Sequence, residues 1–106
     1  MANFLLAYHG GGEMGGTDEE KQKNMAAWGA WMQQCGPNLV DGGNPCSNAM
    51  SVSKDGSKEY SGSEKISGYS VIKANNMEEA VRAASMVPLV VDGSGTVDVY
   101  ETFDAM

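Results

Sequence analysis

The sequence predicts an α+β fold of one domain, in which two helices cover one face of a sheet and the elements follow the order βαββαβ. Three observations predict it. A buried-strand pattern opens the chain, a helical pattern with a capping signal follows, and the same strand-to-helix succession recurs in the second half. A chain of 106 residues has the length of a single domain with a modest core.

The first half holds one strand and one long helix. Residues 3–8 are predicted as a buried strand because aromatic and aliphatic side chains precede a run of glycines. A T-x-x-E capping box at Thr17 starts the first helix, which should end at about Cys35, before the Gly-Pro step. The stripe of this helix that we expect in the core consists of Met25, Trp28, Met32 and Cys35, with Trp31 beside it.

The second half completes the pattern. The predicted elements are a strand at 49–53, a polar hairpin tip or mobile loop at 54–68, a strand at 69–72, a helix capped by Asn76 that ends before Pro88, and a last strand at 96–103. This order is typical of a ferredoxin-like sandwich with one sheet face left open. We expect that face to carry Tyr69 and Val71, or else Ser70 and Ile72, with Val97 and Val99 extending it. A homodimer that closes face to face would bury such an apolar surface.

The composition excludes several classes of function. A net charge of −7 without a basic cluster argues against nucleic-acid binding. The longest apolar run, residues 4–8, is too short to cross a bilayer and lacks the basic start of a signal peptide. Cys35 and Cys46 have neither zinc nor disulfide-framework spacing, so we expect reduced cysteines in a cytoplasmic protein. One histidine and two separated cysteines also predict no metal site, and no cofactor is predicted.

The stretch "AYHGGGEMGG" at residues 7–16 has three interpretations. It contains the HGGG of lipase-like oxyanion loops, but no G-x-S-x-G nucleophile elbow occurs in the chain. Its glycines between Gly10 and Gly15 fit a nucleotide-binding fingerprint, but carboxylates crowd the following helix start without a compensating Lys or Arg. The remaining interpretation is a turn in which glycines adopt positive φ, and we expect no nucleotide binding.

The chain as a whole resembles the YCII-related family, on the branch that includes the DGPF-domain proteins. The resemblance spans about residues 3–103 and rests on "FLLAYHG", "AAWGAWMQQCG", "LVDGGNP", "ISGYSVIKANNMEEAVRAASMVP" and "GSGTVDVYE". It implies a dimeric α+β barrel whose sheets face each other. It also implies a small enzyme or ligand-binding protein with a pocket between sheet and helices.

The ionisable residues of the family do not carry over. The first helix lacks the histidine of the type member's dyad, Val87 precedes Pro88 where its aspartate would stand, and the D-G-P-F segment is missing. His9 is the chain's one histidine, and histidine is the residue type that exchanges protons near neutral pH. The candidate catalytic residues are therefore His9 and Asp41. The candidate ligand-binding residues are Tyr8, Asn44, Glu64 and Tyr69.

The two catalytic candidates also have a structural interpretation. His9 could hydrogen-bond a loop carbonyl at a strand end, and Asp41 could be a turn residue that accepts backbone N–H groups. Two functions therefore remain open. The first is a dimer that binds a small molecule, with weak acid–base catalysis by His9 held by Asp41 or Glu64. The second is a structural or regulatory module without chemistry, which the missing dyad favours.

Overall fold

The computed structural model describes residues 1–10, 17–60, 62 and 65–105, and its centre is a four-stranded antiparallel sheet. The sheet has the order β2-β5-β1-β6, so β1 and β5 are central. Its strands are β1 (Ala2–Gly10), β2 (Leu39–Asp41), β5 (Gly68–Ala74) and β6 (Gly95–Glu101). With the two main helices, these strands give the expected βαββαβ order, and the fold class α+β is confirmed.

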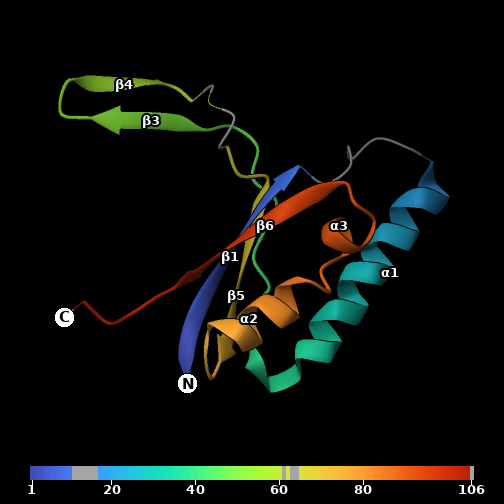
Figure 1. Ribbon diagram of the computed structural model, residues 1–106. Coiled ribbons are helices and arrows are strands. Elements are labelled where there is room, and N and C mark those ends of the chain that lie inside the picture. The colour runs from blue at the N-terminus through green and yellow to red at the C-terminus, as the bar shows by residue number, and fades with distance from the viewer. Residues whose placement is uncertain (11–16, 61, 63–64, 106) are drawn as a thin grey trace.

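The helices lie on one face of this sheet (Figure 1). They are α1 (Asp18–Cys35), the 3-10 turn η1 (Gly36–Asn38), α2 (Met77–Ala84) and the short α3 (Pro88–Val91). Both predicted caps are present: Thr17 Oγ1 accepts the N–H of Glu20 at 3.1 Å, and Asn76 Oδ1 accepts the N–H of Glu79 at 2.8 Å. Each cap satisfies an N–H group that the helix itself leaves unpaired. The sequence analysis did not predict α3.

The core fills the space between the sheet and these helices. Alternate residues of β1 and β5 point into it, because successive strand side chains face opposite sides. Its buried hydrophobic members are Phe4, Leu6, Tyr8, Trp31, Ile72, Ala74, Ala80, Ala84, Val87 and Leu89. Trp31 is the buried residue of α1, whereas Trp28 is half-buried and Met25 is exposed. Three members of the expected stripe, Trp28, Met32 and Cys35, pack against the core. The expectation was wrong for Met25, and Trp31, expected beside the stripe, is the most deeply buried residue of the helix.

The opposite face of the sheet is covered by no described helix. β1 and β5 present Leu5, Ala7, Tyr69 and Val71 there, in register as Leu5 with Val71 and Ala7 with Tyr69. Of the two expected alternatives, the one with Tyr69 and Val71 outward is therefore observed. The expectation for the last strand was wrong: Val97 and Val99 pair with the core residues Tyr8 and Leu6 and face the helices. The last strand presents Thr96, Asp98 and Tyr100 on the open face instead.

A separate two-stranded hairpin forms an arm between β2 and β5. Its strands are β3 (Met50–Ser53) and β4 (Gly56–Glu59), and they form a sheet of their own. The expected second strand of the main sheet at 49–53 therefore belongs to this arm, and Leu39–Asp41 takes its place. Figure 1 shows the arm extending away from the helices. The radius of gyration, 15.1 Å, exceeds the value of about 13 Å that is typical of a compact domain of this length.

Candidate functional site

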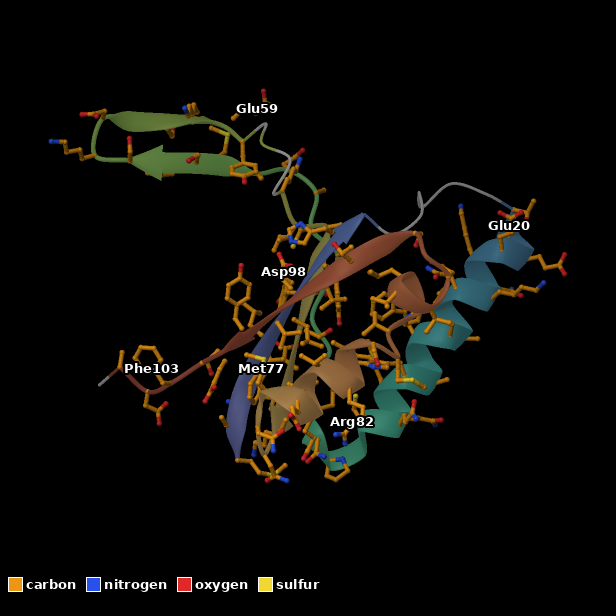
Figure 2. The ribbon with its side chains drawn as sticks, in the orientation of Figure 1. Glu20, Glu59, Met77, Arg82, Asp98 and Phe103 are labelled. Carbon is orange, nitrogen blue, oxygen red and sulfur yellow. The ribbon has the colours of Figure 1, made fainter. Side chains whose placement is uncertain are left out.

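His9 and Asp98 form a hydrogen-bonding contact on the open face of the sheet. His9 Nε2 lies 2.9 Å from Asp98 Oδ2, and the exposed fractions of the two side chains are 20% and 56%. Register explains the contact: His9 pairs with Thr96, so Asp98 lies diagonally across from it on the same face. The pair therefore joins a central strand to the edge strand β6, and Figure 2 shows Asp98 on the side of the sheet away from α1.

In this contact His9 Nε2 faces the carboxylate, and within the described residues no other atom of the imidazole forms a hydrogen bond. An ionised carboxylate only accepts hydrogen bonds, so the contact with Asp98 favours the neutral tautomer in which Nε2 carries the proton. The lone pair then lies on Nδ1, which makes Nδ1 the atom able to take a proton from a bound molecule. A carboxylate that orients an imidazole in this way also stabilises the imidazolium that such a transfer creates.

Aromatic and aliphatic side chains lie beside this pair. Tyr69 is half-buried and pairs with Ala7, the residue that also pairs with Asp98 on the other side of β1. Tyr100 follows Asp98 on the same face of β6 and is 55% exposed. A flat apolar molecule could therefore stack on the centre of the sheet while its polar group reaches His9. Among the candidate ligand-binding residues, Tyr69 is the one whose strand position places it on the face of His9.

The expected partner of His9, Asp41, lies elsewhere. It is on β2, two strands away from β1, and pairs with Val71. Its Oδ1 accepts the backbone N–H of Gly43 at 2.8 Å, which is the turn role that its neighbouring glycines allowed. Asn44 is exposed and follows this turn, next to the bridge between Pro45 and Gly68. Glu64 and Gly11–Gly15 lie outside the described residues.

Tyr8 was expected in the same site as His9 but faces the helices. It is 5% exposed, and its hydroxyl donates to Ser70 Oγ at 2.7 Å, which in turn donates to the Gly42 carbonyl at 2.8 Å. Adjacent residues of a strand point to opposite faces, so Tyr8 and His9 cannot contact the same ligand from one side of the sheet. Burial raises the pKa of Tyr8 to about 12, because the phenolate would lose its hydration.

This buried hydroxyl predicts a loss of stability in alkali. Because the folded-state pKa exceeds the value of 10.0 expected in the unfolded chain, the contribution of Tyr8 is complete below pH 10 and is lost as the pH rises toward 12. We expect a loss of about 1–2 kcal/mol, less than the full linkage because the highest pH tested lies below the folded-state pKa of about 12. Urea denaturation of the wild type and Tyr8→Phe at pH 9, 10.5 and 11.5 would measure it. Parallel pH profiles for the two proteins would contradict this prediction.

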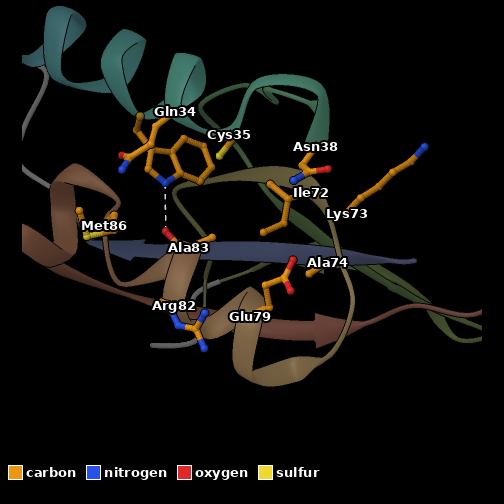
Figure 3. A pocket seen from close by; sticks show the side chains of 11 residues that line it. Gln34, Cys35, Asn38, Ile72, Lys73, Ala74, Glu79, Arg82, Ala83 and Met86 are labelled. Atoms are coloured by element: carbon orange, nitrogen blue, oxygen red, sulfur yellow. Dashed lines mark hydrogen bonds between the residues drawn. The ribbon is translucent and has the colours of Figure 1, made fainter.

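A second candidate site lies on the helix side, between α1, β5 and α2. It is a cavity of about 250 Å³ (Figure 3). Trp31, Ile72 and Ala74 form apolar walls, and the indole N–H of Trp31 donates to the Ala83 carbonyl at 3.0 Å. Polar groups at its edge come from Gln34, Asn38, Glu79 and Arg82. The expected pocket between sheet and helices is thus present, but His9 lies on the opposite face of the sheet from it.

The two cysteines differ in environment. Cys35 is half-buried and lines the helix-side cavity, and burial raises the pKa of its thiol. Cys46 is exposed, so only Cys35 has the buried position expected of a structural cysteine. In the part of the chain that the structure describes, no group of His, Cys, Asp and Glu side chains is arranged to hold a metal ion. The described helices include none that could cross a membrane.

Asp98 is the functional candidate that the sequence analysis missed. The alternation of residues 96–103 placed it on one face of a strand with Tyr100. That pattern alone does not say which strand lies next to it or in which register. Knowledge that β6 pairs antiparallel with β1, with Thr96 opposite His9, would have identified it.

No protein-family model matches the sequence, and no curated protein matches it. Among solved structures, the chain is similar to 5-chloro-2-hydroxyhydroquinone dehydrochlorinase from Burkholderia phenoliruptrix in its complex with 2,5-dihydroxybenzoquinone. The two chains are 15% identical, the alignment covers 96% of this chain and 93% of the other, and the TM-score is 0.57. At this identity the likeness shows the fold alone: the chain shares, over nearly its whole length, the α+β architecture of that enzyme.

Proposed function

We propose that this protein binds a small organic molecule on its open sheet face and that His9 exchanges a proton with it. The observation that carries this proposal is the 2.9 Å contact between His9 Nε2 and Asp98 Oδ2. It holds the chain's one histidine beside an apolar and aromatic surface. Within the described residues Nδ1 has no hydrogen-bond partner, so it can act as a base. The site residues are His9, Asp98 and Tyr69. Asp41 has a structural role, because it holds the turn at Gly43 that lies against the backbone of Tyr69.

The protein works as a homodimer in this proposal. The open face carries Leu5, Val71 and Tyr100, and a second copy placed face to face would exclude water from them and from His9. Removal of water strengthens the electrostatic interaction between His9 and Asp98. This arrangement is the dimeric α+β barrel of the YCII-related and DGPF-domain proteins, whose sequence motifs the chain resembles. The fold shared with a dehydrochlorinase bound to a single-ring quinone supports a ligand of that size.

Calorimetric titration with 2,5-dihydroxybenzoquinone tests the site. We expect His9→Ala to weaken binding at least about tenfold, because the ligand loses the hydrogen-bond partner that exchanges a proton with it. Asp98→Asn should weaken it less, since the imidazole remains but loses its orienting carboxylate. The matched control is Glu101→Gln, which removes a carboxylate from the same strand but from the other face of the sheet. Equal affinity in the wild type and His9→Ala would remove His9 from the site.

The helix-side cavity is the second candidate site for the same ligand class. Its volume of about 250 Å³ is near the lower end of ligand pockets, which suits a single-ring molecule. Gln34→Ala alters its edge at an exposed residue and should leave the fold intact. If Gln34→Ala weakens binding and His9→Ala does not, the ligand binds on the helix side. If the wild type and both variants bind the ligand without exchanging a proton with it, the alternative function, a module without chemistry, is favoured.

A further inference from the structure

Within the described residues, the arm formed by β3 and β4 packs against no core. Every residue of its two strands is exposed except Ser51, which is half-buried. Met50 and Val52 lie on one face of the arm and are 60% and 77% exposed. An isolated two-stranded hairpin is at best marginally stable in water, so a regular ladder with an exposed apolar face indicates a surface that packs against something else.

The stem of the arm is attached next to His9. The backbone N–H of Ser67 donates to the carbonyl of Tyr8 at 2.7 Å, and Gly68 pairs with Tyr8 in the sheet. On the other side of the stem, Pro45 forms a bridge with Gly68. The arm therefore leaves the sheet at the end where His9 lies. It extends away from the helices, toward the side on which Asp98 lies (Figure 2).

The geometry points to an exchange of arms between two copies of this chain whose open sheet faces meet. The apolar face of each arm packs beside the contact between the sheets, at the His9 end of the partner's open face, and forms one wall of the partner's His9–Asp98 site. This inference rests on the proposed function, because it assigns the second copy to that same site. A two-fold axis makes the contact twice, and the two contacts close the assembly. Each copy carries both surfaces, an arm without a core and an apolar sheet face without a cover.

Charge also favours a second copy as the occupant. The chain as a whole carries a net charge of −7, so two copies repel each other through most of their surfaces. The segment 46–60 contains Lys54, Asp55, Lys58 and Glu59, and its net charge is zero. The arm is therefore a part of the chain that can approach an acidic copy without adding to the repulsion.

The first test measures the dimer in Val52→Lys by sedimentation equilibrium. We expect its dissociation constant to rise about 10–100-fold, because each substitution acts at both symmetric contacts. The added lysine lowers the net negative charge, so repulsion between copies cannot explain the weakening. Ser51→Lys is the matched control: it adds the same charge on the opposite face of the arm and should leave the dimer unchanged. Circular dichroism should show an intact fold in both, since neither position contributes to the core.

Three outcomes of the sedimentation test contradict the exchange of arms. An unchanged dimer in Val52→Lys, equal weakening in Val52→Lys and Ser51→Lys, or a monomeric wild type at micromolar concentration would each overturn it. None of these results depends on a ligand. The loss of binding in His9→Ala can therefore stand even if the arm exchange fails.

The second test mixes two defective variants, Val52→Lys and His9→Ala, and titrates the mixture with 2,5-dihydroxybenzoquinone. In a mixed dimer, the intact His9 of one copy meets the intact arm of the other, so one site of two is complete. Random exchange makes half of the dimers mixed, and we expect about a quarter of the wild-type binding capacity. No recovery, with both parents inactive, would overturn the shared site. Full binding by His9→Ala alone would overturn the proposed function. The exchange of arms would then be decided by the sedimentation measurements of the first test.

Discussion

Trp31→Ala is expected to lower the free energy of unfolding by about 3–5 kcal/mol, the range for a large aromatic side chain removed from a core. Trp31 is 3% exposed and packs between α1 and the rest of the core, in edge contact with Trp28 at a ring separation of 6.1 Å. Its indole N–H donates to the carbonyl of Ala83 at 3.0 Å. The substitution therefore leaves a cavity and removes a hydrogen bond that links α1 to α2.

Trp28→Ala provides the comparison for this prediction. Trp28 is half-buried and packs on Tyr8 at a ring separation of 5.1 Å, so it loses less apolar contact on truncation. Urea denaturation should therefore show a clearly smaller loss than for Trp31→Ala. Both variants change the same residue type on the same helix, so helix propensity contributes equally. A larger loss for Trp28→Ala would mean that α1 is rotated from the orientation described.

Gly43→Ala is the second substitution with a large expected effect. Gly43 has φ +75°, a conformation that L side chains rarely adopt, and an added Cβ would overlap the backbone carbonyl of Tyr69 on β5. The carbonyl is part of the strand and cannot rotate away, so the turn or the strand must shift. We expect a loss of about 2–4 kcal/mol from backbone strain and overlap together. The shift would also move Tyr69, on the face of the candidate site.

Gly93→Ala is the matched control for Gly43→Ala. Gly93 has φ +78°, nearly the same backbone conformation, but nothing lies within 4 Å of an added Cβ. It should therefore show the strain alone, about 1 kcal/mol. Thermal unfolding of the two variants separates the two causes. Equal melting temperatures would show that the Tyr69 carbonyl moves away from the added Cβ without lowering the stability of the protein.

The candidate site could be predicted from the sequence only in part. His9 was identified because it is the chain's one histidine and follows a buried strand, and its position at the end of β1 agrees with that interpretation. Its partner, Asp98, was not identified, because Asp41 and Asp98 are equally plausible partners of His9 when only their distance along the chain is known. The contact between His9 and Asp98 joins residues 89 positions apart, and sheet register alone determines it.

The placement of Tyr8 shows why adjacent residues were wrongly assigned to one site. Tyr8 and His9 are neighbours in sequence, yet one donates to Ser70 in the core and the other contacts Asp98 on the open face. The alternation of a strand makes this separation predictable once the strand is known. Which of the two faces is the core depends on the side to which the helices pack.

The sequence by itself determined the features that arise from local interactions. Capping side chains, glycines and apolar periodicity act over a few residues, so the positions of β1, α1 and α2 along the chain and the two caps follow from short segments. The tertiary structure decided three features that depend on long-range packing. It placed Leu39–Asp41 in the sheet and residues 50–59 in the arm, turned Trp31 rather than Met25 into the core, and brought Asp98 to His9. These choices depend on strand pairing and helix rotation, which are set by the combined packing of segments far apart in the chain.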